Sequence, residues 1–480
     1  MVQGARDNPE LFPVPDNARK TGTLAYTFMI LSMAVTTSIF FLGWFSQILE
    51  LNMLQTIVAA LIGNSVVALI MTLNGYVGIK YGIPFPVQLR PAFGYRGSVL
   101  PLLVRVVVSI FWYGIDGYIA AWAITEMAMI IAGVPSDRIV EIALRYTPIT
   151  FVLYLLFVWA VGYKKITGIK VLDSIAGPLL MAFFAWFTYY LTTLPGLPGE
   201  FPSLTEGGVS WTSGNFFLMI AVQTAWWSTI ALNVSDICRF NVSRSVSSLA
   251  AAHFAGLVIP QLVGTWLGYV ATSLTGGEES PIDIIATYSP SPLLAFFGLL
   301  FAALATGSTN VTGDVPAATN GIIRLTGWGW HRSLTAATFL AWLLIGPYSI
   351  VRWEEALDVA NTLLLFNWFY SMWLGPIAAV MVLDYWVIRR REYPVEELYK
   401  YGESSRFWRG SGYSSGVGWI GVASFLLGIL GEYIISTVQG NLQVFAGFIP
   451  VPGIELAWYY GFFISAVSYL ILSLLFLRRG

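Results

Sequence analysis

The sequence contains little charge and almost no cysteine. Charged residues make up 11% of the 480 residues, whereas a soluble domain carries roughly 25%. Hydrophobic residues make up 56%, and the mean hydropathy is +0.70. A polytopic membrane protein is the class that fits this composition. The single cysteine, Cys238, excludes an intrachain disulfide and gives no information about the redox compartment.

The sequence also lacks the side-chain sets that enzymes use. No Cys/His metal set, phosphate-binding loop or nucleophile–base pair occurs in it, which argues against a membrane-embedded enzyme and predicts no cofactor. His253 stands alone in an apolar run and is interpreted as a core histidine, and His331 lies in a predicted loop. The first 23 residues form a short polar tail, with no cleavable signal peptide ahead of the first apolar run.

Long apolar runs dominate the remainder of the chain. A run must cross about 30 Å of hydrocarbon to span a bilayer, and twelve runs meet or approach that length, of which 148–162 is short. They lie near 24–48, 53–74, 101–132, 148–162, 171–194, 214–237, 248–274, 292–323, 334–351, 359–388, 416–437 and 457–477. The fold class predicted from them is an all-α polytopic membrane protein with 12 transmembrane helices.

The distribution of basic residues predicts the orientation of these helices. With the N-terminus inside, 22 of the 25 Lys and Arg residues fall in inside segments, and only Arg138, Arg145 and Arg352 fall outside. Cytoplasmic loops carry such an excess of Lys and Arg. The count therefore supports twelve spans, a multi-pass protein of the cell membrane and cytoplasmic termini.

Polar interruptions recur in spans that a five-plus-five division would pair. The first span holds Ser32 and Thr36–Ser38, and the sixth holds several polar residues between Gln223 and Asn233. The third and eighth spans each carry an aspartate at mid-membrane depth, Asp116 and Asp314. Inverted repeats with interrupted helices and a binding site at the midplane are typical of secondary transporters.

The stretch Ala303–Asp314, with the sequence ALATGSTNVTGD, is the most polar part of any predicted span. An aspartate at the centre of a membrane helix costs roughly 2.5–3.5 kcal/mol on insertion scales, and such residues usually face a cavity or pathway. Ser308 and Thr309 could coordinate a cation, since hard cations take oxygen ligands, while Asp314 contacts a small solute. Alternatively, the two hydroxyls bond to carbonyls one turn earlier in their own helix.

Two aromatic positions could hold a flat solute. Trp112 and Asp116 are four residues apart and share a helix face, so they form an aromatic plate beside a carboxylate, unless Trp112 is ordinary packing and Asp116 the partner of a buried donor. Trp226 and Trp227 adjoin each other in the sixth span, where one could stack on a ring and the other pack. Glu126, near the outer end of the third span, is interpreted as solvated or structural.

Five colinear motifs resemble nucleobase–cation symporter family one, which contains hydantoin, cytosine, uracil and allantoin permeases and relatives that move vitamins. The motifs are GIPFPVQLRPAFGYRGS (82–98), FWYGIDGYIAAWA (111–123), WSTIALNVSDICRF (227–240), ALATGSTNVTGDVPAATN (303–320) and GPIAAVMVLDYWVIRRREYPVEELY (375–399). The resemblance implies the leucine-transporter-type fold, a ten-helix inverted repeat with two extra helices. The implied divisions are a cytoplasmic tail 1–23, repeat halves 24–195 and 213–388, a cytoplasmic loop 389–415 and a final helix pair 416–477.

The resemblance also implies a set of site residues. The tryptophan plates fall on Trp112 and Trp227, and a substrate-contact position falls on Thr36. The implied Na⁺ ligands are the hydroxyls of Ser308 and Thr309 and the carbonyls of Ala305, Ser32 and Val35.

Two positions depart from the family pattern. Asp116 and Asp314 stand where the family commonly has amides. An amide both donates and accepts hydrogen bonds, whereas an ionised carboxylate only accepts. The departures favour a substrate that is cationic or rich in N–H or O–H donors over carbonyl-rich hydantoin or uracil.

The predicted function is symport of a small planar heterocycle by alternating access, coupled to Na⁺. H⁺-coupled symport of a cationic or donor-rich vitamin or nucleobase through Asp116 and Asp314 is the alternative. A channel, or a membrane enzyme such as a lipid hydrolase using the two aspartates, is a remote one. The expected partners are the heterocycle, Na⁺ or H⁺ and the lipid bilayer, with no nucleic acid and a monomeric state.

Overall fold

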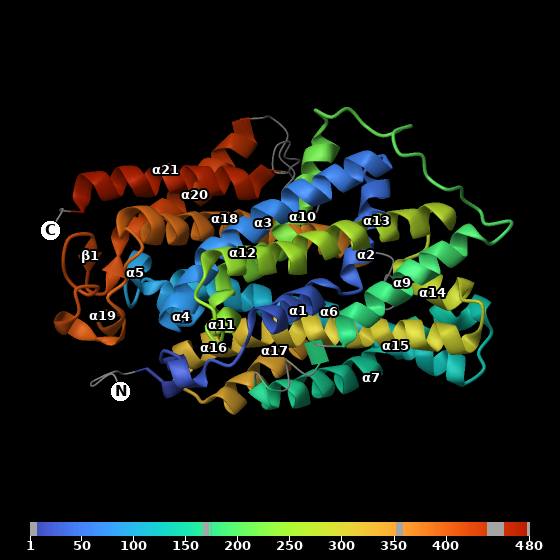
Figure 1. Cartoon of the computed structure of the whole chain (residues 1–480), viewed down its shortest axis with the longest axis horizontal. Helices are drawn as coiled ribbons and strands as arrows, with labels where there is room; N and C mark the ends of the chain where they lie inside the picture. Colours follow the sequence, from blue (N-terminus) through green and yellow to red (C-terminus); the bar gives the residue numbers. More distant parts are fainter. Residues whose placement is uncertain are drawn as a thin grey trace.

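The computed structural model describes residues 7–165, 167, 172–173, 175–351, 359–438 and 456–477. Long helices run side by side along the longest axis of the molecule (Figure 1). The helical segments up to residue 192 are η1 (Pro9–Leu11), η2 (Asp16–Ala18), α1 (Thr23–Ala34), α2 (Ser38–Ile48), α3 (Met53–Tyr81), α4 (Phe85–Gln88), α5 (Arg90–Phe93), α6 (Val99–Ile131), α7 (Ser136–Tyr163) and α9 (Ala176–Thr192).

The helices continue after residue 213. The next segments are α10 (Gly214–Asn233), α11 (Ser235–Cys238), α12 (Val246–His253), η3 (Phe254–Val258), α13 (Ile259–Leu274), α14 (Pro281–Tyr288), α15 (Pro292–Thr309), η4 (Asn310–Asp314), α16 (Val315–Thr326), α17 (Trp330–Val351), α18 (Val359–Leu383) and η6 (Asp384–Ile388). The last segments are α19 (Val395–Tyr399), η7 (Gly402–Ser404), the hairpin strands β1 (Tyr413–Ser414) and β2 (Val417–Gly418), α20 (Trp419–Val438) and α21 (Ala457–Phe476).

Each of the twelve predicted apolar runs coincides with a helix or a chain of helices. Within the described residues, eight helices are long and apolar enough to cross a membrane, or nine if α1 and α2 form one bent span. The protein is therefore a multi-pass membrane protein, while the count of twelve and the inverted repeat stay predictions. One boundary differs clearly, because α7 begins at Ser136 and not near residue 148. Its first turns carry Arg138, Glu141 and Arg145, so the helix extends beyond the apolar run.

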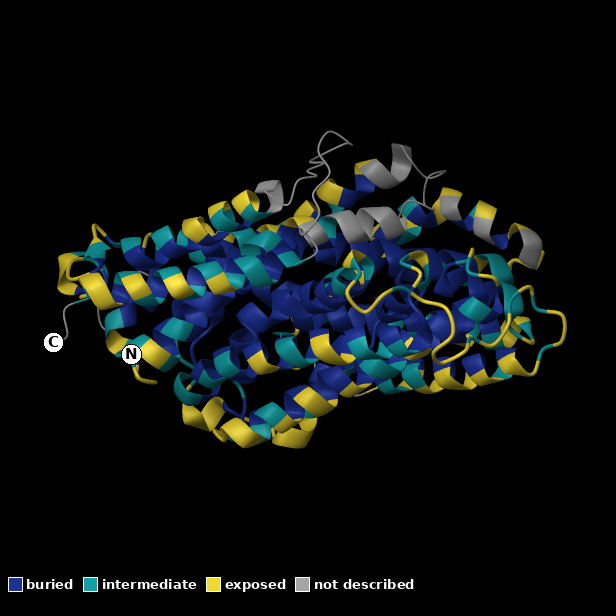
Figure 2. Ribbon diagram, turned by 90° about the horizontal axis from the view of Figure 1, so that it is seen from above, coloured by how far each residue is buried: buried dark blue, intermediate teal, exposed yellow. Residues whose placement is uncertain are grey.

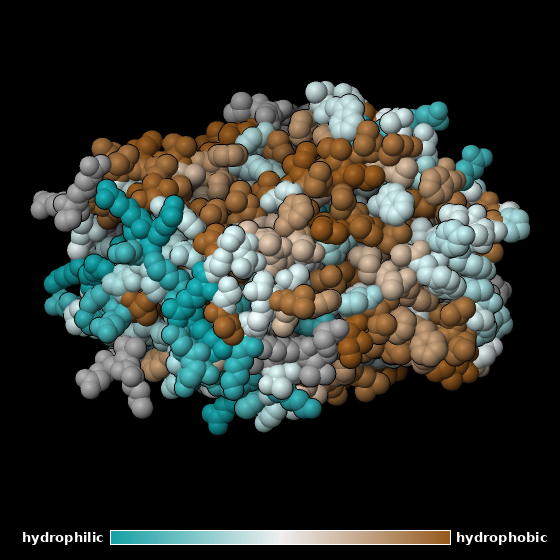
Figure 3. Space-filling model, viewed as in Figure 1, coloured by the Kyte–Doolittle hydropathy of each residue, from teal (hydrophilic) through white to brown (hydrophobic). Residues whose placement is uncertain are grey.

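Apolar side chains cover the outside of the bundle as well as its interior. Large hydrophobic side chains such as Leu69, Leu153 and Phe463 are more than half exposed, an arrangement that a soluble monomer avoids over large areas. Figure 3 shows brown apolar residues over most of one face, with the most hydrophilic residues toward the end where both termini lie. Buried residues fill the middle of the bundle (Figure 2).

The first span is broken at Val35–Thr37. Helices α1 and α2 are bent by 48° at this point, and Val35 has an extended backbone with φ −89° and ψ 91°. The break coincides with three consecutive β-branched residues, which lose side-chain freedom in a helix. The bend therefore has a local cause. Because the helix is interrupted there, main-chain groups near residue 35 do not take part in a continuous helical hydrogen-bond pattern.

The eighth predicted span is interrupted by the π-helical turn η4 between α15 and α16. Single π turns inside α-helices are rare and occur often at functional sites. All residues from 305 to 323 are buried, so this polar segment lies inside the protein and away from lipid. It coincides with the stretch that the sequence singled out.

The structure bears on the count of basic residues that predicted the orientation. Both ends of the described chain lie at the same end of the molecule, close to α19 and β1 (Figure 1). Arg105 was counted as a basic residue of an inside segment, but it lies inside α6 and is 1% exposed. Arg6, Lys170, Arg352, Arg478 and Arg479 lie outside the described residues.

Candidate functional site

The break in the first span lies beside the eighth span. The Thr309 hydroxyl donates a hydrogen bond to the main-chain oxygen of Met33 at 2.7 Å. One turn earlier, the Thr306 hydroxyl lies 3.2 Å from the Thr36 hydroxyl and 3.1 Å from that of Thr37. The structure thus brings together the two segments that the resemblance assigned to one cation site, and it places Thr36 at their junction.

The predicted cation ligands have other partners within this junction. Thr309 is also 3.3 Å from the carbonyl oxygen of Ala305, so the bond within its own helix forms together with the bond to α1. The Ser308 hydroxyl donates to the Asp173 carboxylate at 2.6 Å, and the Ser32 hydroxyl donates to the main-chain oxygen of Asp173. Val35 is the first residue of the break and follows the last residue of α1. Their role as Na⁺ ligands stays a prediction.

Aromatic side chains gather where α6, α10 and α18 meet. The ring centroids of Trp112 and Trp226 are 4.9 Å apart and the rings are inclined at 58°, and the ring centroid of Tyr370 lies 6.1 Å from that of Trp112. Trp227 is buried, and its indole nitrogen has no hydrogen-bond partner in the described part of the chain. The structure therefore places Trp226 against Trp112, whereas Trp227 is the residue that the resemblance implied as the second plate.

The two membrane aspartates belong to the same interior region. Asp116 and Asp314 are 3% and 5% exposed, and each is close enough to Tyr370 and Tyr154 to interact with them electrostatically. Asp116 also experiences the charge of Asp314. One carboxylate oxygen of Asp116 has no hydrogen-bond partner among the described residues, which leaves an acceptor for a donor group of a ligand.

The glycines beside Asp116 serve helix packing. A Cβ atom on Gly114 would lie 2.5 Å from Ile345 and 2.9 Å from the carbonyl oxygen of Ala341. A Cβ atom on Gly117 would lie 3.1 Å from Phe151. Both glycines therefore allow neighbouring helices to approach α6, and neither opens space for a ligand.

Arg105 is a buried cation that the orientation count assigned to an inside segment. Its guanidinium donates to the Asn233 side chain at 2.9 Å, to the Ser109 hydroxyl and to the carbonyl oxygen of Gly313 at 3.4 Å. It is also within electrostatic range of Asp314. Because a buried charge is retained only when it is paired or hydrogen-bonded, Arg105 offsets part of the negative charge of the site. Its spacing of seven residues from Trp112 and eleven from Asp116 is a helix-face signal that could have found it.

A polar region continues from the site toward the end of the molecule that holds the termini. Asp236 accepts hydrogen bonds from the main-chain nitrogen of Phe85 at 3.1 Å and from the Asn320 side chain at 2.9 Å. Asp236 and Asn320 line a cavity of about 160 Å³ together with Glu10 and Lys165, which form an ion pair of 2.7 Å. This cavity lies between the interior site and the N-terminal tail.

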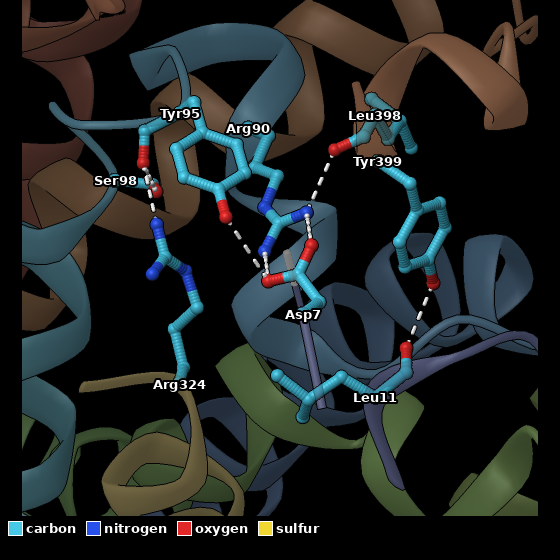
Figure 4. A network of polar contacts seen from close by, with 8 residues as sticks. All are labelled: Asp7, Leu11, Arg90, Tyr95, Ser98, Arg324, Leu398 and Tyr399. Atoms are coloured by element: carbon cyan, nitrogen blue, oxygen red, sulfur yellow. Dashed lines mark hydrogen bonds and ion pairs between the residues drawn. The ribbon is translucent and has the colours of Figure 1, made fainter. Parts of the chain in front are cut away.

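The N-terminal tail is fixed at this end by buried polar contacts (Figure 4). Arg90 forms two hydrogen bonds with the Asp7 carboxylate, at 2.8 and 2.7 Å, and both side chains are almost completely buried. The Tyr399 hydroxyl donates to the main-chain oxygen of Leu11 at 2.8 Å. The tail residues thus connect α5 with the region of α19.

The architecture matches that of solved structures along almost the whole chain. The structure titled MHP1, a nucleobase-cation-symport-1 family transporter, in a closed conformation with bromovinylhydantoin bound, superposes with a TM-score of 0.78 at 20% identity and covers 98% of this chain and 96% of its own. The structure titled MhsT in complex with L-phenylalanine superposes with a TM-score of 0.56 at 13% identity and covers 94% and 98%. The chain therefore shares the fold of these solved structures.

The sequence comparisons define the family. Residues 13–464 match the family described as permease for cytosine/purines, uracil, thiamine, allantoin. The chain is 26% identical to a purine-uracil permease of Arabidopsis thaliana over 435 residues, covering 85% of this chain and 68% of the relative. It is 24% identical to the hydantoin permease of Microbacterium maritypicum, covering 89% and 84%. The chain belongs to this permease family, which confirms the predicted membership of nucleobase–cation symporter family one. Its relatives are permeases and not enzymes.

Proposed function

We propose that this chain is a secondary transporter that moves a small planar heterocycle together with Na⁺ by alternating access. The observation that carries the proposal is the junction between the two interrupted spans, where Thr309 bonds to Met33 beside the buried aromatic and acidic side chains. Interrupted helices at the midplane expose oxygen atoms that can bind an ion. The ion and the solute would then bind side by side, so that each can stabilise the same closed state.

The proposed cation site uses the hydroxyls of Ser308 and Thr309 with main-chain oxygens of Ala305, Ser32 and Val35. Support comes from Thr309, the last residue of α15, whose hydroxyl contacts main-chain oxygens of both α15 and α1. Na⁺ entry down a membrane potential of 100 mV supplies about 2.3 kcal/mol per charge, which is enough for accumulation of the solute against a moderate gradient.

The proposed substrate site is formed by Trp112, Asp116, Trp227, Asp314 and Thr36, with Trp226 as an additional ring. Two buried carboxylates and one buried guanidinium leave a net negative charge when all three are ionised. This charge favours a heterocycle that presents N–H donors or carries a positive charge. An aminopyrimidine, or a vitamin with a ring of that type, has this chemistry.

H⁺ coupling is the second candidate, and the electrostatic interaction between Asp116 and Asp314 favours it. Two like charges oppose each other's ionisation, so one of the two carboxyls can carry a proton. We further propose twelve spans with both termini in the cytoplasm, in line with the common end at which the termini lie (Figure 1). A monomer is the proposed state.

Uptake into proteoliposomes tests the function. Purified protein is reconstituted, and radiolabelled cytosine, uracil, allantoin, hydantoin and thiamine are offered separately, with Na⁺ or choline outside at fixed pH. Uptake that requires Na⁺ supports the Na⁺ symporter. Uptake that is unchanged in choline but increases with an inward H⁺ gradient removes Na⁺ and supports H⁺ coupling. Release of a hydrolysed product, or uptake that does not saturate, contradicts a transporter of this kind.

A further inference from the structure

Asp173 is a buried carboxylate next to the proposed cation site, and sequence reasoning assigned it no role. It lies shortly before α9 and is completely buried. One carboxylate oxygen accepts a hydrogen bond from the Ser308 hydroxyl at 2.6 Å, and the other accepts one from the Thr312 hydroxyl at 2.8 Å. The main-chain oxygen of the same residue accepts the Ser32 hydroxyl.

These contacts bring oxygen atoms from three parts of the chain to one point. Ser32 belongs to α1, Asp173 to the segment before α9, and Ser308 and Thr312 to α15 and η4. The approach between α1 and α9 is close, because a Cβ atom on Gly177 would lie 2.5 Å from the Cα atom of Ser32. The point is therefore shared by a helix that is interrupted and a helix that carries a π turn.

The hydrogen-bond directions leave lone pairs available. The hydroxyls of Ser308 and Thr312 use their protons toward the carboxylate, so their own oxygens can still accept or coordinate. The carboxylate has about four lone-pair sites, of which the two hydroxyls use two. Oxygen ligands of this type are those that hard cations take in proteins.

Charge gives a second reason for a cation. No cationic side chain among the described residues forms an ion pair with Asp173. An isolated buried carboxylate is costly unless it is paired or coordinates a cation. A single carboxylate surrounded by hydroxyls balances one positive charge, which fits a monovalent cation better than a divalent one.

We infer that Asp173, Ser308 and Thr312 form a carboxylate-bearing binding site for a monovalent cation of the size of Na⁺. The inference rests on the proposed function, since it adds a charged ligand set beside the neutral oxygens of Val35, Ala305 and Thr309. Ser308 belongs to both sets. A cation at Asp173 connects the segment before α9 to α15 and η4, and the hydrogen bond of Ser32 to the main-chain oxygen of Asp173 links the same segment to α1. Binding and release of the cation therefore act on the relative position of these helices.

Direct cation binding tests the site on the full-length protein. Binding of ²²Na⁺ to purified protein in detergent is measured for the wild type and for Asp173→Asn, Thr312→Val and Thr272→Val. Thr272 is a matched control, because its buried hydroxyl bonds only within α13. We expect Asp173→Asn to weaken Na⁺ binding at least tenfold, Thr312→Val to weaken it several-fold and Thr272→Val to leave it unchanged.

A second measurement separates a ligand from a purely structural contact. Asp173→Glu keeps the charge but moves it by one methylene, so it should change the preference between Na⁺ and Li⁺, which a structural role would not do. Wild-type affinity for Na⁺ in both Asp173→Asn and Thr312→Val overturns the inference, as does a wild type that binds no monovalent cation. Heterocycle binding, measured in choline on the same samples, reports separately on the proposed function. If the wild type binds none of the heterocycles, the proposed function fails whatever the ²²Na⁺ result.

Discussion

The Thr309 hydroxyl and the main-chain oxygen of Met33, 2.7 Å apart, join the end of α15 to the last turn of α1. This hydrogen bond directly links the two interrupted spans at the proposed cation site, in addition to the contacts of Thr306 with Thr36 and Thr37. The same hydroxyl is 3.3 Å from the carbonyl oxygen of Ala305. Replacing the hydroxyl with a methyl group therefore removes both a possible ion ligand and the link between the helices.

We expect Thr309→Val to lower the apparent affinity for Na⁺ in uptake by about tenfold, equivalent to about 1.4 kcal/mol. A buried acceptor left without its donor costs about 1–3 kcal/mol, so this magnitude is in the expected range. Thr272→Val, whose hydroxyl bonds within its own helix, should change the Na⁺ dependence less than twofold. Equal effects of the two variants would contradict a role for Thr309 at the ion site.

Asp314→Asn should discriminate between substrates by charge. The substitution keeps the size of the side chain but removes a negative charge near Arg105. A cationic heterocycle should then bind much more weakly, by tenfold or more, while a neutral heterocycle of the same shape should lose severalfold at most. Binding of such a pair, measured by calorimetry, checks this expectation. Similar losses for both compounds would show that the charge of Asp314 does not select the substrate.

The helices could be predicted from the sequence because hydropathy and run length report directly on burial in a bilayer. The polar stretch around Ser308 and Thr309 was also identifiable, since polar residues inside an apolar run need a reason. Its neighbour in α1 was found through the resemblance. The structure places the two side by side through Thr309 and Met33, while their roles as ligands stay predictions.

Other site residues could not be predicted from the sequence, and each has its own physical reason. Asp173 lies 135 and 139 residues away from Ser308 and Thr312, and no local pattern connects positions so distant. The orientation count assigned Arg105 to an inside segment, because counting Lys and Arg residues does not show which of them are buried. The contact of Trp226 with Trp112 depends on the rotation of α10 about its axis, which tertiary packing determines.

Gly114→Ala should destabilise the protein through steric conflict in the packing of α6 and α17. The added methyl group would lie 2.5 Å from Ile345 and 2.9 Å from a main-chain oxygen, so the helices must separate. Overpacking of this kind typically costs about 1–3 kcal/mol. Gly329→Ala is the control, because no atom lies within 4 Å of its added group. A melting temperature in detergent that falls for both variants, or for neither, would contradict this explanation.

Asp7→Asn should weaken the attachment of the N-terminal tail. Arg90 is completely buried and forms its only ion pair among the described residues with Asp7, as Figure 4 shows. Removing one partner of a buried pair typically costs about 3–5 kcal/mol, because the remaining charge is uncompensated. The melting temperature should fall, and protease cleavage within residues 7–22 should become faster. The exposed pair of Glu403 with Arg409 serves as the control, and Glu403→Gln should have no measurable effect.

The short helix α14 should respond to pH through Asp283. Burial raises the pKa of this carboxyl, which faces Glu126 of α6 and lies near Glu279. The Ser280 hydroxyl donates to it at 2.8 Å. An acid whose pKa is higher in the folded state contributes stability that is fully present below about pH 3.9 and declines as the pH rises through the raised value, because the folded state then has to hold a buried charge.

The wild type should therefore lose melting temperature relative to Asp283→Asn as the pH is raised from 5 to 8. Each unit of pKa shift corresponds to about 1.4 kcal/mol. Glu206→Gln removes an exposed acid of another loop and should follow the wild type at every pH. Parallel curves for the wild type and Asp283→Asn would show that Asp283 does not change its protonation in this range. A wild type that gains stability over Asp283→Asn with rising pH would reverse the sign and exclude the buried, protonated carboxyl as the cause.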